Sequence, residues 1–520
     1  MLRQLIKYNS LNKSEKAFIK NFEADLSIKK YSGTDKVLAC VAFDYDLVIY
    51  YRNLLLCMSQ HFNLDPVLID VTMPAQIEGR SFKGSLYNRL AYSSLHRKKL
   101  RRLIGVKNPV FSFLSNNQSY RKYLRKAEEY LKNLNDKVSL LEFESKGLVV
   151  GYLIIDSFLR FSPSATLEIG HPFLKHVIAS AFHIHDQVEN YLTSNIVKTL
   201  FVPYGTYIHY GIIVRECLRR EIPVFSFDTF WNGLGNKVKS DYPMQRPRYF
   251  KYSETFANLD NKDENCKLAE SYLNRRFTGK VDNAISYMKT PAFGKASKQK
   301  LFHTEKPKAL VMLHCFFDSP HIYRNMLFCD FYDWIVTVLS SAGQSTCQFY
   351  VKPHPNGVSG NTIVIERLKE RFPDIVFLPP STSNTAIIEE GVDCVFTVYG
   401  TVAHEFTWFG IPVINAGDNP HINYDFSITP SDRGQLKELI LNPPLKPLDN
   451  LESIRQQICE FYYMHNIYQN PEALPNETFN LTQCPYHRDD SRRLLWYMDN
   501  KKPNSETLEI LKNYFSKYLK

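Results

Sequence analysis

Short apolar runs alternate with amphipathic stretches along most of this 520-residue chain, and that alternation limits the possible folds more than any other feature. In the first half, β-branched runs predict buried strands at 37–43, 66–71, 148–155, 199–202 and 223–227. A helical pattern at 207–220 ends in Arg219 and Arg220, cations that suit a helix C-terminus. Strands separated by helices predict a parallel sheet with helices on both faces.

The second half of the chain repeats this pattern after a polar, charged segment at 258–307. Strands are expected at 308–313, 348–351, 375–378, 394–398 and 412–415, and helices at 331–341, 363–371, 384–390 and 401–409. We therefore predict two Rossmann-like, doubly wound α/β domains, at 1–257 and 308–490, joined by a hinge and separated by an interdomain cleft. The helical segment at 491–520 is expected to pack back toward the N-terminal domain.

Composition excludes several classes of protein. Hydrophobic residues make up 44% and charged residues 22%, a globular profile. No apolar run reaches the ~18–20 residues of a membrane helix, and the N-terminus lacks the apolar run of a signal peptide. A cytoplasmic location is therefore expected. The ten cysteines include no Cys-x-x-Cys pair and are expected to be reduced thiols without a bound metal.

The net charge of +11 is concentrated in two clusters, at 96–102 and 121–126. Solvated helix faces are one interpretation. The other is attraction to an anionic surface, such as the inner face of an inner membrane that carries a lipid-linked acceptor. Because no recognition module surrounds the clusters, nucleic acid is not an expected partner.

A loop stiffened by two prolines follows the strand at 348–351 and forms the first candidate site. Its sequence is Lys352-Pro353-His354-Pro355, and the prolines restrict where the intervening side chains point. Lys352 and His354 could donate hydrogen bonds to a phosphate. A rigid turn with an incidental histidine is the alternative.

A strand-to-helix turn at Gly400-Thr401 forms the second candidate site. Gly400 lets the backbone approach a ligand, and Thr401 begins a helix whose free N–H groups suit phosphate. Glu405 lies one turn later on the same face, where its carboxylate could accept hydrogen bonds from ribose hydroxyls. His404, beside it, is included among the candidate donor-binding residues. A capped core helix with a solvated glutamate is the alternative.

The third candidate site, at 313–321, follows the first strand of the second half. Ser319 could contact a phosphate or leaving group, and Asp318 could anchor the loop. Ligands bind beyond the carboxyl ends of parallel strands, so all three segments are expected to face one crevice. An Asp-Ser-Pro turn without a ligand is the alternative.

In their order along the chain, these segments and the later Gly410-Ile411-Pro412-Val413 resemble the C-terminal domain of capsular polysaccharide synthesis proteins. That group includes transferases for Kdo and related acidic sugars. The resemblance covers about 308–425 and is weaker at 145–230. It implies the GT-B fold, with the nucleotide of the donor held mainly by the second domain. It further assigns His354 and Pro355 to the donor nucleotide, and Gly400, Thr401 and Glu405 to its phosphate and ribose.

An acceptor site in the first half should supply a general base if the transfer inverts stereochemistry. Asp156 is the first candidate, because it ends the strand expected at 148–155. Asp228 and His209 are the others. A helix N-cap is the alternative for Asp156, and a retaining transfer would need no such base.

Asp44-Tyr45-Asp46 has the Asp-x-Asp form that binds a metal in another transferase fold, but it follows the first strand. We interpret it as a loop and helix start. Neutralisation of phosphate by Lys352, His354 and a helix dipole would make a metal unnecessary.

The sequence therefore predicts a metal-independent glycosyltransferase of capsule or lipopolysaccharide synthesis, without a cofactor. The first choice of donor, from the resemblance, is a CMP-activated acidic sugar such as Kdo or a nonulosonic acid. A nucleotide-sugar epimerase of the same fold and a non-catalytic capsule assembly subunit are the alternatives.

Overall fold

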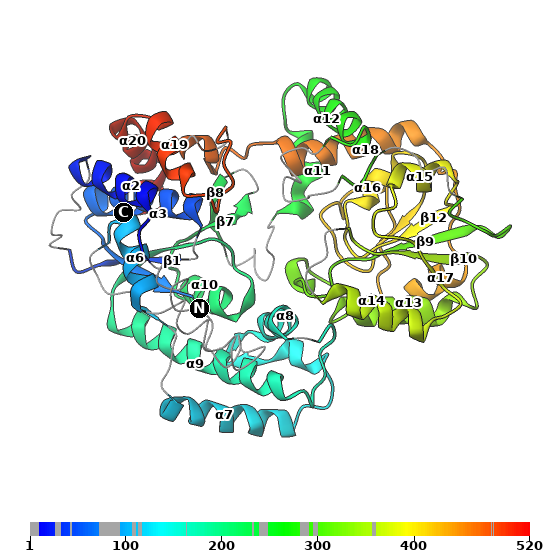
Figure 1. Ribbon diagram of the computed structural model, residues 1–520, viewed down its shortest axis with the longest axis horizontal. Helices are drawn as coiled ribbons and strands as arrows, with labels where there is room; N and C mark the ends of the chain where they lie inside the picture. Colours follow the sequence, from blue (N-terminus) through cyan, green and yellow to red (C-terminus); the bar gives the residue numbers. More distant parts are fainter. Residues whose placement is uncertain are drawn as a thin grey trace. The chain divides into compact units, whose positions relative to one another are not determined.

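The computed structural model describes residues 10–25, 33–41, 44–71, 94–106, 111–112, 117–162, 164–230, 233–238, 248–280, 291–294, 300–355, 360–479, 481 and 483–519. The chain forms two compact units (Figure 1). Unit 1 comprises Met1–Ser162, Glu168–Gln245 and Gln469–Lys520, and unit 2 comprises Pro163–Leu167 and Arg246–Tyr468.

Unit 1 contains a seven-stranded sheet in the order β14-β8-β7-β6-β1-β2-β3. Strands β3, β2, β1, β6 and β7 are parallel, and β8 and β14 extend the sheet antiparallel. The strands are β1 (Lys36–Val41), β2 (Asp65–Asp70), β3 (Phe111–Ser112), β6 (Val197–Val202), β7 (Val224–Phe230), β8 (Gly233–Lys237) and β14 (Leu474–Pro475). The first strand lies centrally and the direction of strand addition reverses beside it, as in a Rossmann-like fold.

The helices of unit 1 surround this sheet, and α3 and α10 contact its strands directly. The helices are α2 (Lys13–Asp25), α3 (Tyr45–Phe62), α6 (Ser94–Ile104), α7 (Asn117–Lys132), α8 (Gly151–Phe161), α9 (Pro172–Ser194), α10 (Tyr207–Arg219), α19 (Arg492–Asn500) and α20 (Asn504–Phe515). Helix α3 begins where Asp44 accepts a hydrogen bond from the backbone of Asp46 at 2.8 Å, which confirms the predicted helix start. Leu511 and Phe515 of α20 share a core cluster with Val37 and Phe201, so the C-terminal helices pack within unit 1.

The prediction of a strand at 148–155 is wrong. Only Leu148–Val149 form a strand, β5, which pairs in a hairpin with β4 (Glu144–Ser145), and helix α8 begins at Gly151. A Cβ atom at Gly151 would lie 1.9 Å from the carbonyl oxygen of Leu140, so only glycine fits where the helix begins. Most of α8 is buried, and a helix that is apolar on every side gives the same run of apolar residues as a buried strand.

Unit 2 is built on five parallel strands in the order β11-β10-β9-β12-β13. They are β9 (Lys308–Met312), β10 (Gln348–Lys352), β11 (Val376–Phe377), β12 (Cys394–Phe396) and β13 (Val413–Ile414). Figure 1 shows α13 (Phe331–Ala342) and α14 (Asn361–Arg371) on one side of this sheet, and α15 (Asn384–Glu389) and α16 (Val402–Thr407) on the other. The remaining helices are α11 (Tyr252–Ala257), α12 (Lys262–Phe277), α17 (Arg433–Leu441) and α18 (Leu451–Tyr462).

These units differ from the expected domain limits in several places. Residues 164–167 and 248–257, expected in the first domain, belong to unit 2. The segment at 258–307, expected to be a hinge, contains α12, whose Ala269 and Leu273 share a core cluster of unit 2 with Phe461 and Tyr462. The segment at 469–490, expected in the second domain, belongs to unit 1. Because α12 is polar in overall composition, its one apolar stripe was not recognised in the sequence. That stripe is enough to anchor the helix in unit 2.

Both units have the strand order of a Rossmann-like fold, and two such units in one chain are the domain composition of the GT-B fold. The predicted α/β fold class is therefore confirmed. The cleft expected between the domains stays a prediction.

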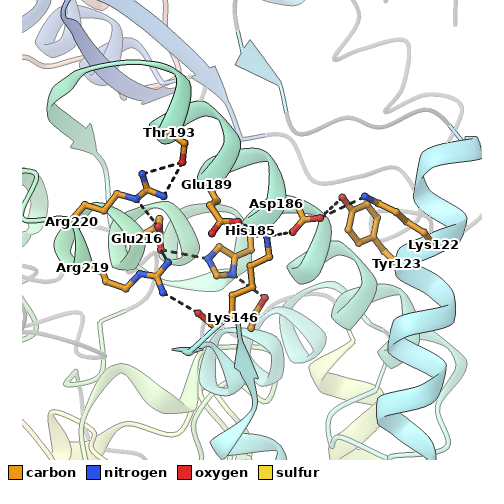
Figure 2. Close-up of polar contacts among 11 residues, drawn as sticks. Lys122, Tyr123, Lys146, His185, Asp186, Glu189, Thr193, Glu216, Arg219 and Arg220 are labelled. Atoms are coloured by element: carbon orange, nitrogen blue, oxygen red, sulfur yellow. Dashed lines mark hydrogen bonds and ion pairs between the residues drawn. The ribbon is translucent and has the colours of Figure 1, made fainter.

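A polar network around the buried Glu216 joins three helices and one hairpin of unit 1 (Figure 2). Glu216 of α10 is fully buried and forms ion pairs with Arg219 at 2.7 Å and Arg220 at 2.8 Å. His185 of α9 lies 3.5 Å from the same carboxylate and forms a 2.8 Å hydrogen bond with Ser145. Burial alone would raise the pKa of Glu216, but hydrogen bonds from His185, Arg219 and Arg220 outweigh burial and lower the pKa to about 2.

At the hairpin turn, Lys146 connects the same network to α9. Its ammonium group pairs with Asp186 at 2.7 Å and with Glu189, and Tyr123 of α7 donates a 2.8 Å hydrogen bond to Asp186 (Figure 2). The network therefore fixes α7, α9, α10 and the β4–β5 hairpin to one another.

We expect Glu216→Gln to lower the free energy of unfolding by about 1–3 kcal/mol at pH 7. Because the pKa of Glu216 is lower in the folded state, its ionised form stabilises the fold above the ordinary glutamate pKa. That contribution is lost as the pH falls toward 2, so the difference between variant and wild type should shrink over the same range. Urea unfolding at pH 7 and pH 4, followed by circular dichroism, measures it.

The matched control is Glu189→Gln, since Glu189 pairs with Lys146 near solvent and should contribute less than about 1 kcal/mol. A difference for Glu216→Gln that stays constant between pH 7 and pH 4 would contradict the electrostatic role of this carboxylate.

Candidate functional site

The candidate site lies at the carboxyl edge of the sheet in unit 2. Strands β10 and β12 both pair in parallel with β9, so the three strands end at the same edge. The three segments singled out in the sequence follow these strands, at 313–319, 353–355 and 399–401. The direction of strand addition reverses between β9 and β12, which is where open α/β sheets bind ligands.

The loop after β10 brings two basic side chains to this edge. Lys352 is buried, and burial lowers its pKa to about 8 against the opposing charge of Glu405. His354 is half-buried, and burial, together with nearby His314 and Lys352, lowers its pKa to about 4. Lys352 is therefore largely protonated at pH 7, and the imidazole of His354 is neutral in the unliganded protein.

The loop after β9 is held in place by hydrogen bonds from two sides. The backbone of Phe316 donates to Asn361 at 3.1 Å, and the Tyr399 hydroxyl donates to the carbonyl oxygen of Ser319 at 3.1 Å. Asp318 is half-buried and accepts a 3.0 Å hydrogen bond from the backbone of Ser319. This ordered loop presents Asp318 at its surface, while the side chain of Ser319 is buried.

In the turn after β12, a side chain at Gly400 would be too close to its neighbours, because a Cβ atom there would lie 2.9 Å from the Thr397 hydroxyl. Thr401 is exposed, and its side chain makes no capping hydrogen bond to α16, which is only six residues long. The hydroxyl of Thr401 instead accepts a 3.3 Å hydrogen bond from Arg276. The helix dipole expected here therefore comes from a very short helix.

Glu405 is fully buried and is bound by residues that the sequence did not single out. Its Oε1 accepts a 2.6 Å hydrogen bond from the Nε of Arg276 and a second one from the same guanidinium, and its Oε2 accepts one from Asn384 at 3.4 Å. Both Thr401 and Glu405 contact Arg276, as expected for residues on one helix face. The ribose contact of Glu405 stays a prediction, and in this structure both of its oxygens already have partners.

Sequence reasoning missed Arg276 because it lies in the polar segment taken as a hinge. The sequence feature that could have pointed to Arg276 is its position in the last turn of α12, directly after Arg275. A guanidinium that is 4% exposed requires a carboxylate partner, and Glu405 supplies it.

His404 lies apart from the residues at the sheet edge. Its ring contacts Phe461 and Tyr462, with centroid distances of 5.4 and 5.7 Å, and burial lowers its pKa to about 3. Pro355, in contrast, is half-buried beside His354. The structure thus brings Lys352, His354, Pro355, Asp318, Ser319, Gly400 and Thr401 together at one edge, and encloses His404 and Glu405 beneath it.

The three candidate bases lie in unit 1. Asp156 does not end a strand but lies within α8, 2% exposed, where it is electrostatically coupled to Arg215. His209, in the first turn of α10, is also buried, and burial lowers its pKa to about 3. The backbone of Asp228 lies within β7, and its side chain is outside the described part of the structure. Their roles in catalysis stay predictions.

The contacts of Ser145, His185 and Glu216 have the order of a hydrolase triad, but the geometry does not support that chemistry. The three side chains are at most 1% exposed, so a substrate carbonyl cannot reach the serine hydroxyl. We interpret them as part of the structural network of Figure 2.

The two basic clusters have different surroundings. In the first cluster, Lys99 is buried and pairs with Glu15 at 2.9 Å, whereas Lys98 and Arg102 are exposed. In the second, Arg121 and Arg125 are exposed on α7. Across the described ranges, no helix has the length and apolar character of a membrane span, and no three His, Cys, Asp or Glu side chains gather as metal ligands.

No protein-family model and no curated protein matches the chain. Solved structures similar to it include a KpsC β-Kdo 2,4-transferase from Thermosulfurimonas dismutans, with 13% identity and a TM-score of 0.31 over 52% of this chain and 79% of that one. A glycosyltransferase from Rickettsia africae has 12% identity and a TM-score of 0.26 over 93% and 98%. UDP-GlcNAc 2-epimerase from Neisseria meningitidis has 11% identity and a TM-score of 0.23 over 82% and 95%. At such low scores these likenesses establish neither family nor activity, and the fold follows from the strand orders above.

We expect Arg276→Met to lower the free energy of unfolding by about 3–5 kcal/mol, because it leaves the buried carboxylate of Glu405 without its main partner. The double variant Arg276→Met/Glu405→Met removes both charges and should recover most of that loss. Urea unfolding of both variants measures the difference.

Arg275→Met is the matched control, because Arg275 is exposed on the same helix turn and should change stability by less than about 0.5 kcal/mol. If the double variant is no more stable than Arg276→Met, the loss comes from packing and the ion pair is not its cause.

Proposed function

We propose that the chain is a glycosyltransferase that binds a nucleotide-activated sugar at the carboxyl edge of unit 2 and transfers the sugar to a surface polysaccharide acceptor. The observation that carries this proposal is the convergence of three loops at the switch point of a Rossmann-like sheet. They place Lys352, His354 and the Gly400–Thr401 turn at one edge.

The chemistry of these groups favours a phosphate ligand. Lys352 supplies a positive charge that is shielded from water, and His354 supplies a ring nitrogen at the surface of the edge. Thr401 offers an exposed hydroxyl, and the glycine before it lets a ligand approach the backbone. A buried ammonium group attracts an anion more strongly than an exposed one, because the protein screens its charge less than water does.

For the donor we propose a CMP-activated acidic sugar such as Kdo or a nonulosonic acid, on the strength of the motif resemblance. The acceptor is proposed to be a glycan or glycolipid of a capsule or lipopolysaccharide. The exposed arginines of α7 support a peripheral contact with the anionic inner face of a membrane. Transfer without a bound metal or cofactor is part of the same proposal.

We expect CMP to raise the melting temperature of the purified chain, and the same rise with and without magnesium, because a ligand of the folded state stabilises it by mass action. A thermal-shift screen of CMP, CDP, UDP, GDP and their sugars measures this. At a ligand concentration of 100 Kd, the stabilisation is about 2.7 kcal/mol.

The outcomes separate the alternatives. A shift with UDP or CDP and none with CMP would replace the donor class. A nucleotide sugar that is isomerised without an acceptor would identify an epimerase. No shift with any nucleotide would contradict a donor site in unit 2 and favour an assembly subunit.

We expect His354→Ala to abolish transfer, a loss of at least about 100-fold, while the melting temperature stays close to that of the wild type. His354 lies half-buried at the loop surface, so its removal should leave the core of unit 2 intact. An assay of sugar transfer from the donor selected above measures the effect.

His303→Ala is the control, because His303 is an exposed histidine of the same unit and should retain full activity. A folded His354→Ala protein with unchanged turnover would contradict the placement of the donor site.

A further inference from the structure

A second histidine lies beside His354 at the edge of unit 2. Strands β9 and β10 pair in parallel with Met312 opposite Lys352, so two residues further along His314 falls opposite His354. The ladder continues past the strands, because the backbone of Leu313 donates a 3.0 Å hydrogen bond to the carbonyl oxygen of Lys352. The two imidazole rings lie with their centroids 6.2 Å apart.

We propose that His314 and His354 form one phosphate-binding pair, and that this pair takes up a proton from solvent when a phosphoryl group of the donor binds. The proposal rests on the proposed function of unit 2. It names the two histidines that bind the charged phosphate of the ligand. His314 lies outside the Lys-Pro-His-Pro loop through which the sequence pointed to phosphate.

The surroundings of His314 orient its ring. The ring packs on Tyr399, with centroids 5.0 Å apart, and on Phe331, with centroids 4.9 Å apart. Its Nδ1 atom is buried and has no hydrogen-bond partner among the residues that the structure describes. Aromatic packing therefore holds the plane of the ring, and no hydrogen bond from a described residue selects one tautomer at Nδ1.

Four other ionisable groups face the pair or act through its neighbours. Lys352 repels a proton on His354, whereas Asp318 attracts one. Glu405 attracts a proton to Lys352, and the Tyr399 phenol packs on His314 and donates a hydrogen bond to the carbonyl oxygen of Ser319. In the unliganded protein the balance disfavours protonation, since the pKa of His354 is lowered to about 4.

A bound phosphate reverses that balance. A phosphate anion beside the two rings favours the imidazolium form, and a charge-assisted hydrogen bond to phosphate is about twice as strong as a neutral one. The proton comes from the buffer and adds to a ring nitrogen, with no bond of the ligand broken. Because binding takes up a proton, the affinity must fall as the pH rises.

The test is isothermal titration calorimetry of the full chain with CMP, CDP and UDP at pH 7.5. At this pH the terminal phosphate is mostly dianionic, because its second pKa is about 6. Titration in two buffers that differ in ionisation enthalpy, HEPES and Tris, gives the number of protons taken up per nucleotide. For the wild type we expect about half to one proton, and an affinity about three- to tenfold higher at pH 6.5 than at pH 7.5.

His314→Gln keeps a polar side chain of similar length that cannot be protonated. It should at least halve the proton uptake and weaken binding about tenfold. His354→Gln should give the same pattern, so the two single variants report on the pair independently. His303→Gln, at an exposed position of the same unit, should leave both quantities unchanged, and melting temperatures verify that each variant folds.

If the wild type binds nucleotide without proton uptake, the proposed role of His314 and His354 as a protonated pair is wrong, whereas the nucleotide site itself is supported. The same conclusion follows if His314→Gln binds with wild-type affinity and uptake. Absence of binding by the wild type to all three nucleotides would instead overturn the proposed function together with the pair.

Discussion

The parallel ladder that joins β10, β9 and β12 is the constraint on which the candidate site of unit 2 depends. A parallel pairing brings the carboxyl ends of successive strands to one edge, however far apart the strands lie in the sequence. Loops that follow strands ending at Met312, Lys352 and Phe396 are thereby brought together. The register also determines which side chains become neighbours, and it sets His314 beside His354. Without this ladder the chain would carry the same residues and no site.

The edge rests on a buried charged layer, in which Arg276 of α12 binds Glu405 and Thr401. Burying these two charges costs several kcal/mol each before their attraction is counted, so the pair is retained only if its geometry is good. Two hydrogen bonds from one guanidinium to one carboxylate oxygen meet that condition. The layer links the turn at Gly400 to a helix more than a hundred residues earlier. It also leaves Lys352 near the negative charge of Glu405, which offsets part of the decrease in the lysine pKa that burial causes.

Periodicity predicted most of the sheet in each unit, because strands such as β9, β10 and β12 are buried on both faces and read as continuous apolar runs. The same signal failed at 148–155, where a fully buried helix has the same composition as a buried strand, and Asp156 was misplaced with it. The segment at 258–307 was read as a hinge because α12 is polar in composition, although a few apolar side chains and Arg276 anchor it through tertiary contacts. His354 was found from its two prolines, whereas His314 could be found only from the register.

The position of a bound nucleotide in a crystal of the full chain tests whether the donor site lies at the carboxyl edge of unit 2. The nucleotide is the one that gives the largest thermal shift, and the readout is where its phosphate lies. We expect phosphate oxygens within hydrogen-bond distance of the His354 ring, with His314 as a second contact and the Gly400–Thr401 turn beside them. An ordered nucleotide bound elsewhere, with this edge empty, would contradict a donor site in unit 2.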